Sequence, residues 1–500
     1  KSQVYIEVGP AELAAPGTQQ ELELMKLARC AAAGLRPLQH RTYPRCSPCS
    51  IAIREASTHL CDVAIVGSGI VGSASALELR KKGFKTLNID ANPSPGYGST
   101  SSSSAISRPF YSNLDSCKAA WEGYHVWKHW ADYVEAPPNA ELAYLNQIGV
   151  AALDVPGSKQ AEAYLQGVKA CMAEIGCDCD EWGAEELQRR LPFISLESYF
   201  PPRRASDNEF GEPNGKSLNG AFFTKHGGYV SDPQLAARNV AEAAMRRGAD
   251  FLWNSRVASL ELDPHKVRVQ GLLLQDGTKV SAPIVINATG PHSSAFHRLA
   301  FSEAAVTDDS LITSKPLQVE VAYIPGPPGI SLDTVMPVMT DFDVGVYMRP
   351  QQGGQLVIGS IEPECDPLVF LEKPEDLPPA LTEAWTDLVY RAGLRLPTLQ
   401  VPNTAQGLIA LYDATPDWTP LYDRSALGGF YSMRGTSGNQ FKNAGVVGKI
   451  LAELVEKCEN GVDHDKEPIQ LPLEHTGNAL NLQQFSRLRK PATNSGSVLG

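Results

Sequence analysis

A glycine-rich turn between a short apolar strand and a helix constrains this sequence more than any other feature. Residues 62–66 (DVAIV) are apolar and β-branched, which predicts a buried parallel strand. GSGIVG follows at 67–72, and then a helical pattern that closes with Arg80, Lys81 and Lys82. Residues 86–89 (TLNI) predict a second strand, which ends at Asp90. This order is typical of a βαβ unit that binds a dinucleotide.

Each position in this unit has a physical role. Gly67 permits the tight turn, Gly69 lets the backbone approach a pyrophosphate, and Gly72 lets helix and strand pack closely. The helix N-terminus offers free N–H groups to that pyrophosphate. An acid at Asp90 can accept the ribose hydroxyls and disfavours a 2′-phosphate. The alternative is a glycine-rich turn in some other α/β unit. The contacts predicted here are Gly67, Ser68, Gly69, Ile70, Val71, Gly72, Asp90 and Ala91.

Composition excludes several classes of protein. The chain has 500 residues, enough for two to four domains, and 43% of them are hydrophobic. The formal net charge of −12 does not favour a nucleic-acid partner. No uninterrupted apolar run reaches the roughly 18 residues of a transmembrane helix. Ten scattered cysteines fit a reducing compartment better than a secreted scaffold.

Further motifs follow in a specific order along the chain. They are GSTSSSSAISR at 98–108, GGYVSDP at 227–233, INATGPH at 286–292, YDATPDWTP at 412–420 and GTSGNQFKNAGVVG at 435–448. With GSGIVG, this series resembles the FAD-dependent amino acid oxidase superfamily, in its sarcosine oxidase, glycine oxidase and dimethylglycine dehydrogenase branch. The resemblance spans roughly residues 60 to 455.

The resemblance implies an α/β protein with a Rossmann-type FAD-binding domain and a substrate domain built on a mixed or antiparallel sheet. We expect that second sheet to contain residues 317–324, 343–349 and 355–359. The expected FAD domain comprises residues 60–110, 225–315 and 405–455, and the expected substrate domain residues 111–224 and 316–404. The cofactor contacts implied by the later motifs are Ser99, Thr100, Val257, Ala288, Thr289, Gly290, Gly435, Ser437, Gly438, Asn439, Gln440 and Lys442.

The resemblance also implies a pocket for an anionic substrate. Sarcosine oxidases hold the substrate carboxylate between an arginine and a lysine, which correspond here to Arg108 and Lys442. Arginine presents a planar fork to a carboxylate and lysine a point charge, so the pair suits an amino acid. Tyr347 matches a family tyrosine placed over the flavin. The alternatives are solvated surface charges and an ordinary half-buried strand residue.

Three departures from the family pattern shape the expected chemistry. The family's covalent attachment points, a cysteine and a histidine, are replaced here by Ala410 and by serines at 101–104, so we expect non-covalent FAD. The lysine that activates oxygen in sarcosine oxidases is replaced by Val357, which favours a dehydrogenase over an oxidase. The family also has a histidine just after the strand that carries this lysine, and no residue at 360–363 corresponds to it. The sequence therefore does not identify the substrate.

The two ends of the chain differ from the middle. Residues 1–59 are expected to form an N-terminal extension. From Met25 onward it is Arg-rich and nearly acid-free, as in an organelle transit peptide, although an unstructured basic extension is the alternative. The expected location is the mitochondrial matrix, with the cytoplasm as the alternative. Residues 456–500 are expected to form a tail that wraps the body or is disordered.

The leading hypothesis is a flavoprotein that oxidises the C–N bond of a secondary or N-methyl amino acid, with a flavoprotein or quinone as electron acceptor. One alternative is a 2-hydroxy-acid dehydrogenase. The other is a non-catalytic FAD-fold scaffold or assembly factor of a mitochondrial respiratory complex, with other chains as partners. No metal site is expected, because the pairs Cys46/Cys49 and His125/His129 lack further ligands.

Overall fold

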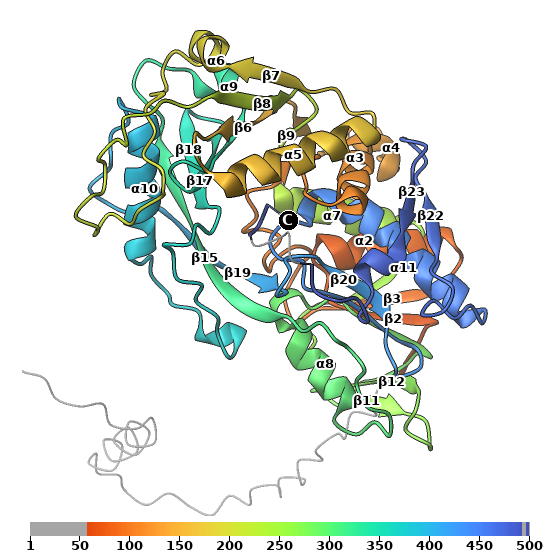
Figure 1. Ribbon diagram of the computed structural model, residues 1–500. Helices are drawn as coiled ribbons and strands as arrows, with labels where there is room; N and C mark the ends of the chain where they lie inside the picture. The colour runs from red at the N-terminus through yellow and green to blue at the C-terminus, as the bar shows by residue number, and fades with distance from the viewer. Residues whose placement is uncertain (1–57, 493–496, 500) are drawn as a thin grey trace, which may run out of the picture. The chain divides into compact units, whose positions relative to one another are not determined.

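Two large β-sheets form the framework of the molecule (Figure 1). The computed structural model describes residues 58–492 and 497–499. The predictions for the transit-like segment, including Met25 and the Cys46/Cys49 pair, therefore lie outside the described residues. By their contacts, the described residues belong to one compact unit.

The first sheet has six strands and contains the glycine-rich unit. Its first five strands are parallel to their neighbours, and β20 closes one edge antiparallel to β21. The two strands predicted around the glycine turn are present, as β2 and β3. In order across the sheet the strands are β10 (Asp250–Leu252), β3 (Thr86–Ile89), β2 (Val63–Val66), β14 (Ile284–Asn287), β21 (Phe430–Arg434) and β20 (Leu421–Arg424).

Both faces of this sheet are covered, as the unbroken apolar strands predict. Helices α2 (Ile70–Lys81), α7 (Pro233–Arg246) and α11 (Ala444–Glu459) lie together on one side (Figure 1). The other side packs against α8 (Ser293–Phe301) and a four-stranded sheet. That sheet has the order β1 (Thr58–Leu60), β13 (Lys279–Ser281), β12 (Val269–Leu274) and β11 (Val257–Leu262).

The second large sheet has eight strands and is antiparallel except where β16 runs parallel to β6. It contains the three predicted strands, although the one predicted from residue 343 begins at Val346 because a turn closes at Gly345. In order the strands are β19 (Gly407–Ala414), β15 (Lys315–Pro325), β18 (Gln355–Ser360), β17 (Val346–Gln351), β16 (Val338–Asp341), β6 (Val150–Asp154), β8 (Gly220–Thr224) and β7 (Asp180–Gly183).

One strand from the segment expected in the FAD domain belongs to the eight-stranded sheet. Residues 405–455 were expected to belong to the FAD domain, yet β19 pairs with β15 along its whole length, from Lys315↔Ala414 to Ala322↔Gly407. The chain therefore leaves the eight-stranded sheet after Ala414 and enters the six-stranded sheet at Leu421.

The remaining elements connect and cover the sheets. A three-stranded sheet joins β4 (Ile106–Ser107), β9 (Gly228–Val230) and β5 (Leu145–Asn146). The other helices are α3 (Leu114–Lys128), α4 (Trp130–Tyr133), α5 (Lys159–Glu174), α6 (Ala184–Arg190), α9 (Leu332–Val335) and α10 (Glu383–Arg395). Short 3₁₀ turns occur at η1 (Gly290–His292), η2 (Pro374–Asp376), η3 (Phe441–Asn443) and η4 (Leu482–Phe485).

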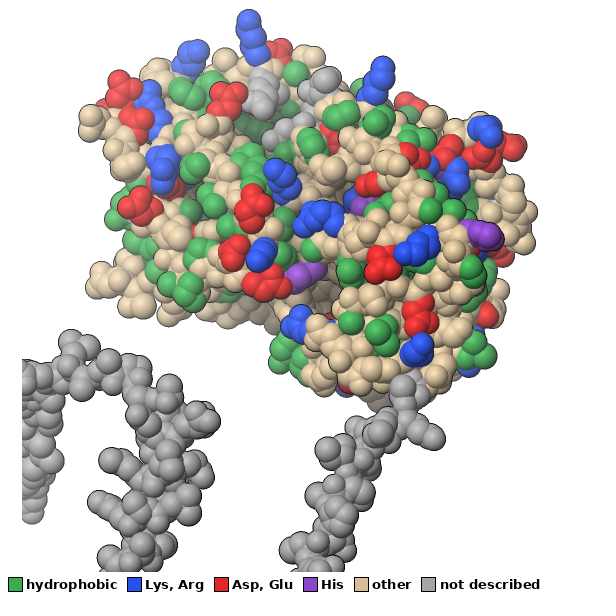
Figure 2. Space-filling view, turned by 90° about the horizontal axis from the view of Figure 1, so that it is seen from below, with side chains coloured by type: hydrophobic (Ala, Val, Ile, Leu, Met, Phe, Trp, Pro, Cys, Tyr) green, Lys and Arg blue, Asp and Glu red, His purple; other side chains and the backbone are tan. Residues whose placement is uncertain are grey.

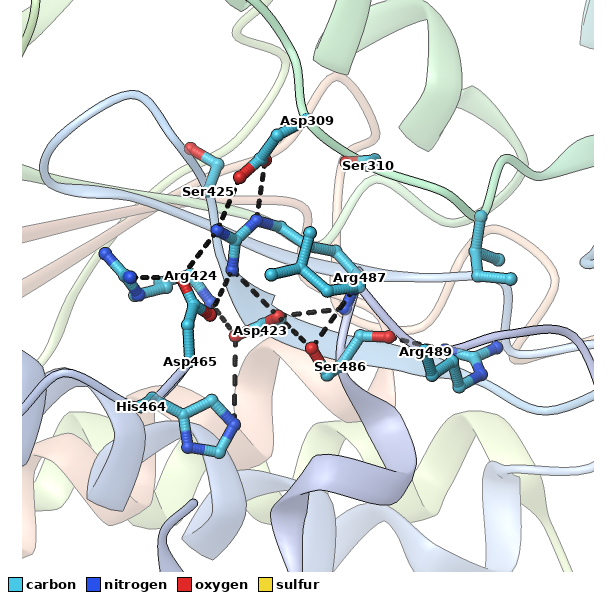
Figure 3. A network of polar contacts seen from close by, with 12 residues as sticks. Asp309, Ser310, Asp423, Arg424, Ser425, His464, Asp465, Ser486, Arg487 and Arg489 are labelled. Atoms are coloured by element: carbon cyan, nitrogen blue, oxygen red, sulfur yellow. Dashed lines mark hydrogen bonds and ion pairs between the residues drawn. The ribbon is translucent and has the colours of Figure 1, made fainter. Parts of the chain in front are cut away.

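The described part of the predicted tail wraps the body and is ordered. It forms a hairpin of β22 (Gln470–Pro472) and β23 (Ala479–Asn481). Arg487, in the tail, then contacts three acidic groups, which are Asp309 and Asp423 in the body and Asp465 in the tail itself, as Figure 3 shows. The guanidinium lies 2.7 Å from Asp309, 3.1 Å from Asp423 and 2.8 Å from Asp465. The described residues of this segment therefore pack against the rest of the chain, with Leu471, Leu480 and Phe485 in the apolar core.

The surface carries mixed charge. On the face in Figure 2, basic and acidic side chains are interspersed with apolar ones. Among the described residues, no helix has both the length and the apolar character that crossing a membrane requires.

Candidate functional site

The glycine-rich turn and several predicted contacts lie at one edge of the six-stranded sheet. Because β2, β3, β14 and β21 are parallel, their carboxyl ends share that edge. Gly67 follows β2, Asp90 follows β3, Ala288 follows β14 and Gly435 follows β21. Ligands of open α/β sheets bind in the crevice outside the carboxyl ends of the strands. The sheet order therefore brings these predicted residues together.

The glycine turn is packed too tightly for side chains at two positions. Gly67 has a φ of +108°, and a Cβ there would lie 2.3 Å from the carbonyl oxygen of Ala288. A Cβ on Gly72 would lie 2.2 Å from the carbonyl oxygen of Gly67. Helix α2 therefore approaches the turn more closely than any other residue would allow.

The N-terminus of α2 is suited to a phosphate group. Its N-cap, Gly69, makes no side-chain capping bond, and the first turn holds no acidic residue. The Ser68 hydroxyl is buried without a hydrogen-bond partner among the described residues. A helix N-terminus with free N–H groups and a positive dipole end binds anions. With the glycine cradle, these residues fit the pyrophosphate of a dinucleotide.

Asp90 is held in place by two backbone amides. Its carboxylate accepts hydrogen bonds from the Ser68 N–H at 2.6 Å and from the Asn92 N–H at 2.8 Å. A carboxylate has about four lone-pair positions, so it retains acceptor capacity for ribose hydroxyls. Asp90 also links the end of β3 to the glycine turn, a structural role that the sequence pattern did not indicate.

The loop after β3 closes over the turn. The Ile70 N–H donates to Thr100 Oγ1 at 3.1 Å, and the Ser99 hydroxyl donates to the Leu411 carbonyl at 2.9 Å. These bonds connect the loop to α2 and to β19. The other predicted contacts of the crevice are half-buried: Ala91 after β3, Val257 at the start of β11, and Ala288, Thr289 and Gly290 after β14.

The loop after β21 has an unusual backbone. Gly435, Ser437 and Gly438 all have positive φ, at +67°, +47° and +71°. The buried Asp413 carboxylate accepts the Gly435 N–H at 2.6 Å, and a Cβ on Gly438 would lie 2.4 Å from the Tyr412 ring. The loop is thereby fixed against the end of β19. Asn439 and Gln440 follow it, both buried.

Arg108 and Lys442 lie on one aromatic ring. The Arg108 guanidinium and the Lys442 ammonium are each 4.7 Å from the centroid of Tyr111, and their residues are 7% and 3% exposed. Arg108 donates to the carbonyl oxygens of Phe110 and Val498, and Lys442 donates to the carbonyl of Asn439 at 2.7 Å. Within the described residues, neither cation has a carboxylate partner.

The two cations repel one another. The pKa of Lys442 is held well below its ordinary value, first by burial and then by the charge of Arg108. Burying a cation without a counter-ion is costly. An anion bound beside both side chains would relieve that cost, so the arrangement suits a ligand that brings a carboxylate with it.

Tyr347 faces the same region from the eight-stranded sheet. Its hydroxyl lies 2.6 Å from Ser104 Oγ, in the serine loop that precedes Arg108, and burial raises its pKa to about 12. Val357 is 1% exposed and pairs across the ladder with Arg349. The Arg349 guanidinium donates to the carbonyls of Ser104, at 2.8 Å, and Pro350, at 3.0 Å.

Three residues near the site were missed in the sequence. Tyr111 lies three positions after Arg108, and no sequence motif marks it as a site residue. Glu362 stands in the segment at 360–363 in which no counterpart of the family histidine was found, and its φ is +52°. Burial, assisted by Asp366, raises its pKa to about 8. Val498 belongs to the predicted tail, and no local signal places it here.

No three His, Cys, Asp or Glu side chains gather in a group that could hold a metal ion, within the part of the chain that the structure describes.

Comparisons with known proteins agree with this geometry. The profile of the family described as "FAD dependent oxidoreductase" matches residues 62–454. Monomeric sarcosine oxidase from Bacillus sp. (strain B-0618) is 26% identical over 216 residues, which is 43% of this chain and 48% of that protein. The match thus spans about half the length of that relative.

Solved structures show the same fold. L-proline dehydrogenase from P. horikoshii has a TM-score of 0.63 at 20% identity, covering 80% of this chain and 94% of that one. Glycine oxidase from Geobacillus kaustophilus has a TM-score of 0.63 at 19% identity, covering 86% and 99%. At these identities the likeness establishes the fold.

Proposed function

Because this chain belongs to the FAD-dependent oxidoreductase family, we propose that it oxidises the C–N bond of a secondary or N-methyl amino acid. The observation that carries this proposal is the pair Arg108 and Lys442, two buried cations on one tyrosine ring without a carboxylate partner among the described residues. The names of similar proteins, which include sarcosine, proline and glycine enzymes, are consistent with such a substrate.

FAD would be held at the carboxyl edge of the six-stranded sheet. The glycine turn and the N-terminus of α2 would take the pyrophosphate, and Asp90 the ribose hydroxyls. When bound, FAD supplies a hydride acceptor at its N5 atom.

The protein's own groups position the substrate. Arg108 and Lys442 bind its carboxylate, which directs the C–H bond next to nitrogen toward the cofactor. Tyr347, whose hydroxyl lies 2.6 Å from Ser104 Oγ, would stand over the flavin. With the substrate held in this way, the carbon next to its neutral nitrogen would give up a hydride to the bound cofactor, and water would hydrolyse the iminium ion left behind. Catalysis here is mainly orientation of the reacting carbon.

We further propose that FAD is bound without a covalent link, since Ala410 and the serines at 101–104 offer no thiol or imidazole. Acid precipitation should leave the yellow colour in the supernatant. A flavin that stays with the pellet would refute this assignment.

We propose a dehydrogenase and not an oxidase because Val357, an apolar residue, stands at the position of the family's oxygen-activating lysine. Its ladder partner Arg349 is cationic but is engaged by two backbone carbonyls. Electrons would then pass to a flavoprotein or a quinone. Stopped-flow mixing of reduced holoprotein with oxygen should give slow reoxidation, and a rate typical of true oxidases would contradict the proposal.

The decisive experiment is an anaerobic titration of purified holoprotein. Its panel contains N-methyl amino acids, proline, glycine and 2-hydroxy acids, and the absorbance of oxidised flavin is followed. We expect bleaching by N-methyl or cyclic secondary amino acids. Bleaching by 2-hydroxy acids alone would select a hydroxy-acid dehydrogenase, and no bleaching by any compound would select a non-catalytic role.

A further inference from the structure

A short segment of the predicted tail lies in the region proposed for the substrate. Val498 and Leu499 are 8% and 5% exposed, and they belong to an apolar cluster with Leu317, Tyr347 and Trp418. Tyr347 is the residue expected beside the flavin. The segment therefore occupies space that the proposed substrate needs.

The backbone of Val498 is bound by side chains from three separate parts of the chain. Its carbonyl oxygen accepts from Arg108 Nη2 at 2.8 Å and from Asn439 Nδ2 at 3.3 Å. Its N–H donates to Glu362 Oε2 at 2.9 Å. Arg108 follows β4, Asn439 lies in the loop after β21, and Glu362 follows β18.

This set of contacts resembles the recognition of an amino acid. The Val498 carbonyl oxygen accepts a hydrogen bond from Arg108, the residue assigned to the substrate carboxylate. The Val498 N–H donates to the acidic side chain of Glu362. The branched side chain is enclosed by apolar groups. Segments that only pack on a surface satisfy their backbone mainly with water or other backbone groups. Here both polar groups of one residue are met by side chains of the site.

We propose that Ser497–Leu499 is an internal pseudosubstrate, which occupies the carboxylate site until an apolar amino acid displaces it and presents its nitrogen to Glu362. The proposal rests on the proposed function, because it takes Arg108 as the carboxylate ligand. A substrate then binds only to the fraction of molecules whose segment is displaced, so its apparent Kd is the intrinsic Kd divided by that fraction.

The test compares three holoproteins in calorimetric titrations with 3-methylbutanoate, which is valine without its amino group. The first is wild type, and the second is the double variant Val498→Ala, Leu499→Ala, which weakens the apolar hold of the segment. The third is Leu368→Ala, Val369→Ala, a matched control that removes the same two side chains from an exposed loop, where they are 44% and 43% exposed. FAD content and thermal unfolding confirm that each protein is folded.

We expect the Val498/Leu499 variant to bind the probe about tenfold more tightly or better, and the control to match wild type. Hydrogen exchange at residues 497–499 of wild type should accelerate when the probe saturates the site. Equal affinity in all three proteins, or exchange unchanged by the probe, would overturn the pseudosubstrate.

The same experiments distinguish failure of the proposed function from failure of the pseudosubstrate. If the probe competes with the segment but no amine bleaches the flavin, the catalytic proposal is wrong and the competition stands. If amines bleach the flavin while the segment has no effect on affinity, only the pseudosubstrate is wrong. No binding of the probe to any of the three proteins would overturn the carboxylate site itself and both proposals with it.

Discussion

Two buried cations on the ring of Tyr111 dominate the chemistry at the scale of single residues. Lys442 carries a depressed pKa because burial and Arg108 both disfavour its charge. Such a pair is unfavourable in an empty site and favourable around an anion. The local electrostatics therefore select for a ligand with a carboxylate before any contact to its other groups is considered.

If the proposed carboxylate site is correct, truncating Arg108 to Ala should remove the guanidinium proposed to bind the carboxylate and leave Lys442 as its sole charged partner. We expect a loss of about 2–4 kcal/mol in transition-state stabilisation, calculated from the ratio of kcat/KM values. Arg108→Lys should recover part of it, since an ammonium lacks the planar fork. FAD content should stay near wild type. Normal turnover by a flavin-loaded Ala variant would show that Arg108 is structural.

Glu362 should make stability depend on pH. Its pKa of about 8 in the folded protein exceeds the ordinary value of 4.5, because burial and Asp366 disfavour the carboxylate. Between these values the folded state keeps a proton that the unfolded chain has released, so stability falls as pH rises from about 4.5 to 8. The Glu362→Gln variant has no carboxyl group to titrate at this position, so its thermal midpoint should fall less between pH 5 and pH 8 than that of wild type.

The matched control for this experiment is Glu364→Gln, two residues away on the exposed surface. It should keep the wild-type difference between the two midpoints. A Glu362→Gln protein with that same difference would show that the carboxyl is not buried in the folded state.

The candidate site residues that sequence reasoning named are those whose position a motif fixes. Arg108 and Lys442 were expected in one pocket although they are 334 positions apart, and the structure brings both to Tyr111. Tyr111 and Glu362 were not expected, because nothing within a few residues of either distinguishes it from a packing aromatic or a surface acid. Their role depends on which distant segments approach them.

At the scale of elements, the strand–turn–helix unit is where local sequence and tertiary packing agree most closely. Residues 86–89 form the predicted strand, and α2 begins at Ile70, within the GSGIVG motif. Residues 407–414, which the sequence assigned to the FAD domain, form β19 of the eight-stranded sheet before the chain crosses to β20. A strand's sheet membership depends on its partner, which local periodicity does not encode.

Gly72→Ala should disrupt the glycine turn at 67–72, which is proposed to bind FAD. Its Cβ would lie 2.2 Å from the Gly67 carbonyl oxygen, so α2 must move away from the turn. We expect a cost of about 1–3 kcal/mol in stability and a several-fold loss of bound FAD. The control is Gly393→Ala in α10, where a new Cβ meets no atom within 4 Å. That variant should retain its FAD and gain up to about 1 kcal/mol from helix propensity. Full flavin content in Gly72→Ala would contradict the close approach.

At the scale of the whole molecule, the chain builds its core from segments that are far apart in sequence. The six-stranded sheet takes strands from residues near 63, 250, 284 and 430. Motif order predicted this assembly, since the family's signatures are spread along the chain. The path of residues 460–492 was not predicted in detail, because it is held by scattered apolar side chains and single charged groups and lacks periodicity.

Arg487 is one of the charged anchors of that path. It is 2% exposed and contacts Asp309, Asp423 and Asp465, and the Asp423 carboxylate is fully buried (Figure 3). These neighbours raise the pKa of Arg487, so it stays charged throughout the accessible range. Removing one member of a buried ion pair leaves its partner without compensation, which costs more than the pair contributed.

Arg487→Ala should therefore destabilise the protein by about 3–5 kcal/mol and lower the thermal midpoint by several degrees. Trypsin should also cleave the segment 457–490 faster in the variant, because the hairpin loses its tie to the six-stranded sheet. Arg189→Ala is the control: its side chain is 75% exposed and pairs with one acid on the same helix, so its loss should cost no more than about 1 kcal/mol. If Arg487→Ala unfolds at the wild-type temperature and resists trypsin equally, the tail is held by its other contacts, such as its buried apolar side chains and the pair of Arg489 with Asp417, and the acidic cluster around Arg487 makes no net contribution to stability.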